Sequence, residues 1–578
     1  VIAALEFEQK LDFLTKGLRF KALGTFKNWS KSINKYSAGW NKYLLGSYEQ
    51  NEDGSYSYTT NRVGNEVSTD LNSTNETAGD RRIYLEAMVD YNRTFGRHDV
   101  NAMLLYNQDE LVNNVPGNNL INSLPKRKQG LAGRLSYAYD GKYMAEVNMG
   151  YNGSENFAKG HRWGFFPSIA LGYNISEESF FEPLRKVITS MKLRGSWGLV
   201  GNDQIGGERF IYMPTINLSG KGFTTGIDQN YGLSGPVYTR YENNSITWEV
   251  GEKINLGIDL QLLNSLNIVV DIFREPRRDI FQKKGTIPTY LGTGNTDVFG
   301  NLAEMKNQGL DLSIDYNKAF SKDFYMNFKG TFTYAHNEIT KYDEAPKYAF
   351  QSKVGQSANV SQGYLSNGLF LDEAEIDRYN QQMGSTLGAG DIKYLNVSNM
   401  HGYGDDIVDV DDWTWIGNPT VPEIVYGFGP SFKYKNWDFS FFFQGVAKTS
   451  LFMSGFHPFG DNSLRNVLQF VANDRWSPTN QNVDAKYPRL TRKTSLNNTN
   501  PGNSGRTSDY WMRDGSFLKL KNMELGYTFK RMRFYISGSN LLTFSKFDLW
   551  DPEQGGGSGL KYPTQRVFNV GFQMTFNN

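Results

Sequence analysis

Apolar and polar residues alternate along long stretches of this chain, and the alternation is clearest near its end. Phe568, Val570, Phe572, Met574 and Phe576 occupy every second position, and Asn, Gly, Gln and Thr separate them. Successive side chains of a strand point to opposite faces, so this pattern predicts a strand with one apolar face and one polar face.

The same pattern recurs along the whole chain and predicts about 17 strands. They are expected near residues 1–13, 18–30, 82–95, 98–108, 128–139, 142–153, 163–175, 189–200, 250–262, 265–280, 307–319, 323–340, 424–434, 437–450, 516–530, 531–543 and 564–577. The polar faces carry acids as well as Ser and Thr: Glu146, Asp259, Asp311, Asp315, Asp438 and Glu524. A soluble sandwich buries its apolar face in a core, whereas a membrane barrel turns that face to lipid and its polar face to a lumen.

The lengths of the connections distinguish these two architectures. Short turns such as Asp140-Gly141 and Lys435-Asn436 join strands in pairs, and long segments alternate strictly with the turns. The long segments are expected at 201–249, 281–306, 341–423, 451–515 and 544–563. Compact soluble domains rarely contain such loops, whereas outer-membrane barrels have long extracellular loops and short periplasmic turns. The sequence therefore predicts an all-β protein, a transmembrane antiparallel β-barrel of the bacterial outer membrane.

Composition and charge agree with this fold class. The 578 residues include 34 Tyr, 39 Phe and 59 Gly, while hydrophobic residues make up only 39%. Tyr, Phe and Gly are the residues of strands, membrane-interface girdles and turns. The net charge of +1 gives no basic surplus for nucleic acid, and the absence of cysteine excludes disulfides and thiol nucleophiles. No apolar run is long enough for a transmembrane helix.

A set of short segments carries a more specific signal. They lie at Leu124–Arg127, Gly130–Arg134, Asn148–Ser154, Gly164–Ser168, Met191–Gly198, Gly201–Asp203, Gly390–Tyr394, Ile416–Pro419, Asp509–Asn522, Tyr535–Phe544 and Tyr562–Arg566. Each segment alone is only a strand or turn fragment. Taken together and in order, they resemble the SusC/RagA-like TonB-dependent outer-membrane transporters over most of the chain.

The resemblance implies a barrel of about 22 strands with a plugged lumen, so about five strands are expected outside this chain. The odd count of predicted strands points the same way, because single-chain bacterial barrels have even numbers. We therefore interpret residues 1–578 as the C-terminal portion of the barrel. The first strands, an N-terminal plug domain and a TonB-binding segment are expected upstream. The resemblance further implies a SusD-like surface lipoprotein as partner and active import of oligosaccharides or peptides.

An acidic segment, residues 404–412, is the strongest candidate for metal binding. Its carboxylates supply the oxygen ligands that calcium prefers, and Asp405, Asp409, Asp411 and Asp412 are the candidate ligands. The resemblance places family acids at Asp405 and Asp409, aligned on Ile416–Pro419, whereas His401 and Tyr403 depart from the family pattern. A solvated acidic loop without a metal is the alternative interpretation.

Aromatic residues of the long loops are the candidate substrate contacts: Tyr403, Trp413, Trp415 and Trp476. Aromatic faces suit sugar rings and apolar peptide side chains. The alternative is that these rings belong to the interfacial girdle or to loop packing.

The sequence gives little support for an enzyme or for any cofactor other than calcium. None of the five His residues follows the pattern of a catalytic triad, and the glycine-rich residues 201–207 lack the lysine of a phosphate-binding loop. Two hypotheses of function remain. One is TonB-dependent import, and the other is a non-energised outer-membrane barrel acting as porin, adhesin or secretion scaffold.

Overall fold

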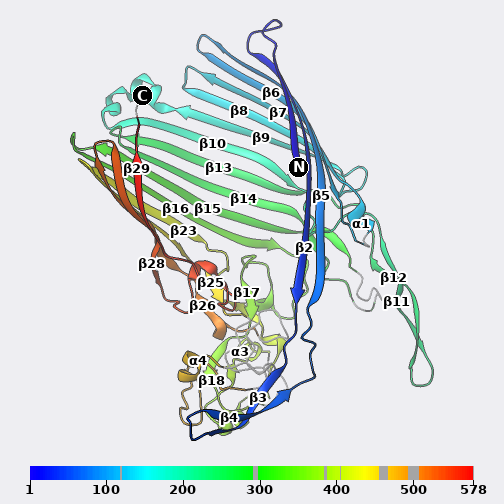
Figure 1. Ribbon diagram of the computed structural model, residues 1–578. Coiled ribbons are helices and arrows are strands. Elements are labelled where there is room, and N and C mark those ends of the chain that lie inside the picture. Colours follow the sequence, from blue (N-terminus) through cyan, green and yellow to red (C-terminus); the bar gives the residue numbers. More distant parts are fainter. Residues whose placement is uncertain are drawn as a thin grey trace.

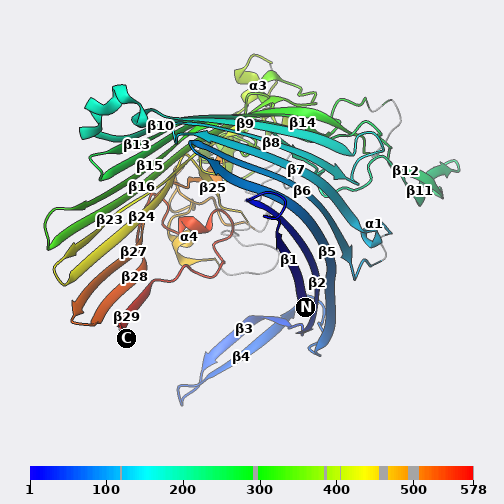
Figure 2. The same ribbon diagram turned by 90° about the horizontal axis from the view of Figure 1, so that it is seen from above.

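The main element of the protein is a 17-stranded antiparallel sheet. It is seen in a computed structural model that describes residues 1–117, 120–288, 290, 297–379, 381–382, 387–403, 405–454, 467–491 and 507–576. Figures 1 and 2 show the sheet curling into an open, barrel-like wall with β1 and β29 at its two free edges. The all-β prediction is confirmed.

The wall is a simple meander. Its strands are β1 (Ile2–Lys10), β2 (Leu18–Ser37), β5 (Asn72–Phe95), β6 (His98–Asn113), β7 (Lys126–Tyr139), β8 (Tyr143–Ser154), β9 (Trp163–Asn174), β10 (Ile188–Asn202), β13 (Glu249–Leu262), β14 (Leu266–Lys283), β15 (Phe299–Ala319), β16 (Phe324–Lys341), β23 (Ile424–Tyr434), β24 (Trp437–Ala447), β27 (Phe517–Phe529), β28 (Met532–Ser545) and β29 (Val567–Met574). Each strand pairs with the next one in this order. Every predicted strand has its counterpart here.

The largest difference from the predicted boundaries concerns β2 and β5. Their pairing continues out to Ser37 and Asn72, and the hairpin β3 (Lys42–Gln50) and β4 (Tyr56–Val63) follows at the tip. Most side chains of this outer ribbon are exposed on both faces. Without a buried face there is no alternation of apolar and polar residues to reveal the strand.

Tight turns close most strand pairs at one end of the wall. Asp140, Asn264, Lys435 and Lys530 adopt positive φ angles of 54°, 54°, 52° and 56°. The turns at Lys435 and Lys530 have two residues between the last paired positions, and those at Asp140 and Asn264 have three. Such short hairpin turns require residues with positive φ. The turn between β9 and β10 differs, because it contains the 3₁₀ helices η1 (Ile175–Glu177) and η2 (Ser179–Lys186). This turn, residues 175–187, is longer than the β8–β9 connection, residues 155–162, at the opposite end of the wall. The expected strict alternation of long and short connections is therefore wrong at this point.

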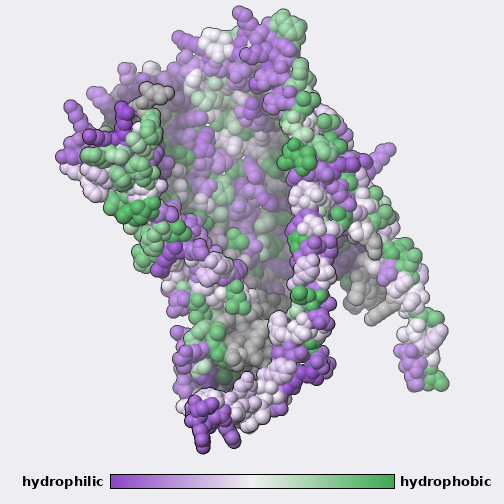
Figure 3. Space-filling model, viewed as in Figure 1, coloured by the Kyte–Doolittle hydropathy of each residue, from purple (hydrophilic) through white to green (hydrophobic). Residues whose placement is uncertain are grey.

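The two faces of the wall differ in polarity as predicted. On β24, Trp437, Phe439 and Phe441 lie opposite Tyr527, Leu525 and Met523 of β27, so the apolar positions of neighbouring strands share one face. The intervening positions carry the polar residues. Figure 3 looks into the hollow of the wall, which contains many hydrophilic residues.

The long connections are folded, contrary to the expectation of plain loops. We call the described residues of 342–423, 448–516 and 546–566 the loop cap; it lies beyond the end of the wall opposite the tight turns (Figure 1). Its elements are η4 (Ala349–Gln351), β17 (Ser361–Gly363), β18 (Ser366–Leu369), α2 (Glu373–Arg378), β19 (Gln381–Gln382), β20 (Ile392–Tyr394), α3 (Val397–Met400), β21 (Ile407–Val408), η5 (Val410–Asp412), β22 (Thr414–Ile416), β25 (Ser450–Phe452), α4 (Gln469–Asn473), η6 (Asp509–Trp511), β26 (Met512–Asp514) and η7 (Pro552–Gln554). A second region outside the wall holds α1 (Leu120–Ser123) and the hairpin β11 (Thr215–Thr225) and β12 (Tyr231–Arg240). In the described part of the chain, no helix combines the length and apolar character needed to cross a membrane.

Candidate functional site

The polar face of the wall is a network of cross-strand pairs. Arg194 of β10 donates to Asp259 of β13 at 3.0 Å and to Asp271 of β14 at 2.6 Å. The other acids expected on this face also have polar partners: Glu146 with Ser136 and Asn148, Asp311 with Thr333, Asp315 with Asn317, and Asp438 and Glu524 with Arg533. Charges paired across strands make this face polar and hold adjacent strands in register.

The loop cap has an apolar core of its own, assembled from segments far apart in the sequence. Tyr364, Tyr394 and Trp511 are fully buried in it, and Phe547 is nearly so. Backbone hydrogen bonds run from Tyr364 N to Thr507 O at 2.7 Å and from Asp509 N to Tyr364 O at 3.1 Å. The cap is therefore a packed unit in which one loop holds another.

A buried ion pair stabilises the cap. The carboxylate of Asp391 has no exposed surface and accepts from Arg489 Nε at 2.6 Å and Nη2 at 2.9 Å. Gly388 N donates to the same carboxylate at 3.0 Å. The hydrogen bond with Asp391 is the main cause of a raised pKa of Arg489. This pair gives a structural role to Asp391, the acid of the segment 390–394.

Trp476 belongs to this core rather than to an open surface. Its side chain is 5% exposed and lies against Gly390, where an added Cβ would come 2.4 Å from the indole ring. Gly390 also has a φ of +84°, which glycine adopts without strain. The ring of Trp476, predicted as a substrate contact, is thus packed against Gly390 inside the cap.

Trp413 lines a cavity of about 520 Å³ at the junction of the cap with the ends of β14 and β16. The cavity is lined by Gln282, Lys283, Lys284, Gly285, Tyr342, Asp343, Glu344, Ala345, Pro346, Gln351, Lys353, Gln362, Val410 and Trp413. The ammonium of Lys353 lies 4.4 Å from the centre of the Tyr342 ring. Burial tends to raise the pKa of Asp343, but donation from Thr286 Oγ1 at 2.9 Å and Gly285 N at 2.9 Å leaves that pKa lowered. Aromatic, cationic, anionic and amide groups thus converge on one hollow, which suits a polar organic ligand.

A second aromatic surface surrounds Tyr403. Its ring centre lies 4.2 Å from that of Tyr348, and Phe350 stacks on His401 at 4.7 Å. We call these four residues the aromatic patch. The sequence reasoning found only Tyr403; the closely spaced aromatics of 342–350 were an available signal. Trp415 does not join the patch, since its indole donates to Ser352 O at 2.8 Å.

The candidate calcium ligands make hydrogen bonds within the cap, and only Asp405 and Asp412 share a partner, Ser398 Oγ. They act as follows: Asp409 caps Asp411 N at 2.8 Å, Asp412 accepts from Asp409 N at 2.8 Å and Ser398 N at 2.9 Å, Asp405 accepts from Ser398 Oγ at 3.1 Å, and Asp411 pairs with Lys347. Burial raises the pKa of Asp412 although Ser398 and Asp409 donate to it. Across the described ranges, no three His, Asp or Glu side chains are placed to hold a metal ion.

These aspartates are satisfied by hydrogen bonds and an ion pair within the protein, and calcium binding stays a prediction. Chelation tests it. If calcium orders residues 405–416, EDTA will accelerate proteolysis there; equal cleavage with and without EDTA is the result expected from the hydrogen bonds above.

Comparison with known proteins identifies the fold. A family model described as TonB dependent receptor-like, beta-barrel, matches residues 6–541. The chain belongs to this family. Its members are receptors of the outer membrane.

Individual relatives agree with the predicted SusC/RagA type, which is confirmed. The chain is 25% identical to the TonB-dependent receptor P3 of Formosa agariphila over 574 residues, 89% of this chain and 54% of that protein. It is 27% identical to the TonB-dependent receptor SusC of Bacteroides thetaiotaomicron over 470 residues, 77% of this chain and 43% of that protein. The RagAB peptide transporter has a similar fold, with a TM-score of 0.70 and 18% identity over 100% of this chain and 62% of that one. The receptor barrel described here spans about half the length of these curated relatives.

Two of the segments that carried the resemblance meet in the receptor barrel. The carboxylate of Asp203, which is almost completely buried, accepts from Ser154 Oγ at 2.8 Å and from Lys128 Nζ at 2.8 Å. The carbonyl of the same residue accepts from Asn156 at 3.0 Å. Asp203 therefore links the start of the β10–β13 connection to β7, to β8 and to the β8–β9 connection at the long-loop end of the wall.

Proposed function

We propose that this chain supplies most of the barrel of a TonB-dependent importer of the outer membrane. Strands β1 to β29 of the wall would cross the bilayer with their apolar face toward lipid, the long loops outside the cell and the tight turns in the periplasm. The cargo would be an oligosaccharide or a peptide, captured together with a SusD-like surface lipoprotein.

One observation carries this proposal: a wide wall with a charged, polar face and a packed cap at one end, in a chain matched by the receptor-barrel family. A polar lining is what a translocation path needs, and an apolar exterior is what lipid needs. A passive porin needs neither an upstream plug nor a link to TonB, so energy dependence separates the two hypotheses.

We further propose that residues 1–578 form the C-terminal part of the receptor and that strands and a plug precede them in the complete protein. The relatives are longer than this chain, as the coverage of 54% and 43% shows. The plug would fill the hollow and contact the polar wall, and its TonB-binding segment would couple import to the inner membrane.

Uptake by cells provides the test of energised import. The complete receptor and its lipoprotein are expressed together, and accumulation of labelled oligosaccharides and peptides is measured with and without TonB. Import predicts accumulation that stops when TonB is deleted. Uptake that persists without TonB would instead establish a non-energised barrel.

Substrate contacts are proposed at Trp413, in the cavity, and at Tyr403, in the aromatic patch, with Trp415 beside them. Tyr403 is 50% exposed, so Tyr403→Ala removes a stacking surface with little cost to packing. Its ligand affinity, measured by calorimetry on the complete receptor, should fall about two- to twelve-fold, the effect of about 0.5–1.5 kcal/mol for an aromatic stacking contact. Tyr562→Ala, at an 80% exposed tyrosine elsewhere in the cap, is the matched control. Equal affinities of both variants would exclude the patch as a binding surface.

A further inference from the structure

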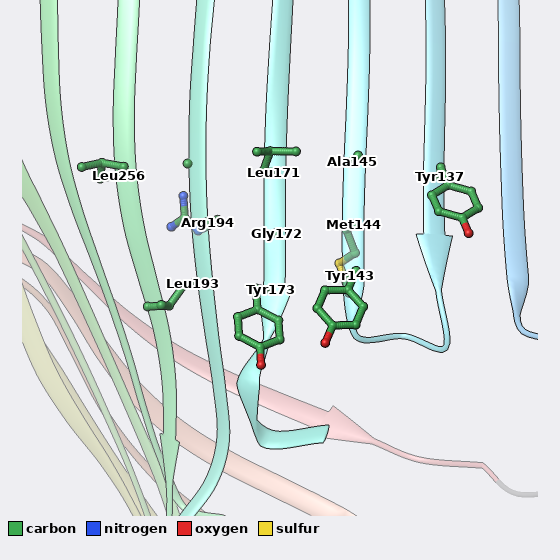
Figure 4. A pocket seen from close by; sticks show the side chains of 11 residues that line it. Tyr137, Tyr143, Met144, Ala145, Leu171, Gly172, Tyr173, Leu193, Arg194 and Leu256 are labelled. Atoms are coloured by element: carbon green, nitrogen blue, oxygen red, sulfur yellow. The ribbon is translucent and has the colours of Figure 1, made fainter. Parts of the chain in front are cut away.

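A shallow groove of about 530 Å³ lies on the apolar face of the wall, across strands β7 to β13 and near the tight-turn end. Its lining is almost entirely apolar. Figure 4 shows Leu171 and Leu256 standing out from β9 and β13, on either side of β10, with the rings of Tyr143 and Tyr173 side by side below them. The charged network of the lumen lies on the other face, so this groove takes no part in the proposed translocation path.

The groove has a clear origin in the sequence and register. Tyr137, Ala145, Leu171, Gly195 and Leu256 lie in one row across five adjacent strands. Large and small side chains alternate along this row. The row is therefore hollow at Ala145 and Gly195 and walled by the three large residues between and beside them.

An aromatic wall closes the groove on the side of the tight turns. The rings of Tyr143 and Tyr173 stack at 5.2 Å with their planes 5° apart. The hydroxyl of Tyr143 donates to Glu178 at 2.6 Å and so is fixed to the β9–β10 turn. Tyrosines with an apolar ring and a hydroxyl toward a polar segment are typical of the membrane interface.

The β9–β10 turn supplies the chemistry expected next to a lipid head group. Phe181 is buried, while Phe180, Leu184 and Val187 are exposed and apolar. Cations and acids are both present beside them: Lys142, Arg185, Lys186, Glu177, Glu178 and Glu182. An exposed apolar edge next to balanced charges suits the interface and a zwitterionic head group.

We propose that this groove binds one acyl chain of a zwitterionic phospholipid of the periplasmic leaflet, whose head group lies at the β9–β10 turn. The inference rests on the proposed function in one respect only, that the apolar face of the wall contacts the bilayer. The groove is continuous with that face. A chain held between Leu171 and Leu256 is in contact on two sides and beneath, whereas lipid against a flat strand has contact on one side.

The test is to fill the groove. Gly195→Leu puts a side chain where the added Cβ meets Leu256 Cδ2 at 3.2 Å, the end of a flexible side chain, and the backbone oxygen of Asn255 at an ordinary contact distance of 3.9 Å. Gly24→Leu is the matched control, a glycine of β2 whose Cβ would meet only Leu85 Cδ2 at 3.5 Å. Both changes add the same apolar side chain to a strand of the wall.

The measurement is native mass spectrometry of the complete receptor, purified in detergent and titrated with phosphatidylethanolamine. The native protein and Gly24→Leu should retain one bound lipid. Gly195→Leu should bind it at least about ten-fold more weakly, because displacing two methylene groups from an apolar site has about that effect. Ala145→Leu should give the same loss and serves if Gly195→Leu does not fold.

Equal lipid retention by Gly195→Leu, Ala145→Leu and the native receptor would overturn the site, as would native receptor without any retained lipid. A receptor that inserts into vesicles and imports cargo, yet retains no lipid, disproves the lipid site alone. A receptor that fails to insert disproves the proposed function instead.

Discussion

The ion pair between Arg489 and Asp391 should control the stability of the loop cap. Arg489→Met keeps the length and much of the apolar stem of the side chain but removes both hydrogen bonds, at 2.6 Å and 2.9 Å, to a carboxylate without exposed surface. Removing one member of a buried pair costs about 3–5 kcal/mol, because the remaining charge is buried without compensation. Arg489 itself is 29% exposed, which places the expected cost at the lower end, about 3 kcal/mol.

Hydrogen exchange of backbone amides measures this cost locally. Gly390 N donates to Phe370 O at 2.7 Å and Phe370 N donates to Asp391 O at 3.0 Å, so both amides are protected while the pair holds the cap closed. A loss of about 3 kcal/mol should accelerate their exchange by about 100-fold. The amides of β24 in the wall should exchange as before.

Two further variants distinguish the buried charge from a general loss of packing. Asp391→Asn added to Arg489→Met should restore part of the protection, because no charge is then left in the core. Lys486→Met breaks a long, exposed pair with Asp474, at 3.6 Å, in the same loop and should change exchange less than three-fold. If Arg489→Met also leaves exchange within three-fold, the reasoning about the buried carboxylate is refuted.

Three other outcomes are expected. Gly390→Ala should open the cap to protease, because it combines a strained φ of +84° with a contact of 2.4 Å to Trp476. Gly402→Ala has a similar φ of +83° but open space around it, and it should lower the unfolding free energy by only about 1 kcal/mol. Similar proteolysis of both variants would contradict the packing argument. Phe441→Arg on the apolar face should lower the unfolding free energy in lipid by about 2–4 kcal/mol if it lies near mid-bilayer, and unchanged refolding yields would count against that facing. Burial favours a higher pKa of Asp551, but hydrogen bonds from Lys519, at 2.5 Å, and from Glu553 N leave that pKa lowered. The Asp551–Lys519 pair therefore stabilises the cap at pH values above the ordinary carboxyl pKa of about 4, and this stabilisation is lost as the pH falls further. Acid-induced exposure of residues 546–566 should appear in the native protein and be absent from Lys519→Met.

The wall could be predicted from the sequence because its determinants are local. Period-two alternation identifies each strand, and turn residues such as Asp140 and Lys530 adopt the positive φ angles that their position requires. The resemblance then supplied the family. The ribbon beyond Ser37 escaped prediction because both of its faces meet solvent.

The loop cap could not be predicted, because its determinants are not local. Tyr364, Trp511 and Phe547 come from three different connections and show no periodicity around them. The same lack of context explains the mixed result for the candidate site. Trp413 and Trp476 look alike in the sequence, yet one lines a cavity and the other packs on Gly390.

This contrast between local wall and non-local cap sets an order of assembly. Each strand of the wall pairs with its neighbour in the order of the wall, and the pairs joined by tight turns can form with little loop entropy. The cap differs, since the hydrogen bonds of Tyr364 with Thr507 and Asp509 close a long loop that contains β23 and β24. The loop cap therefore carries a larger loop-closure cost than the hairpins of the wall, and we expect a receptor stalled during insertion to present formed hairpins beneath an unfolded cap.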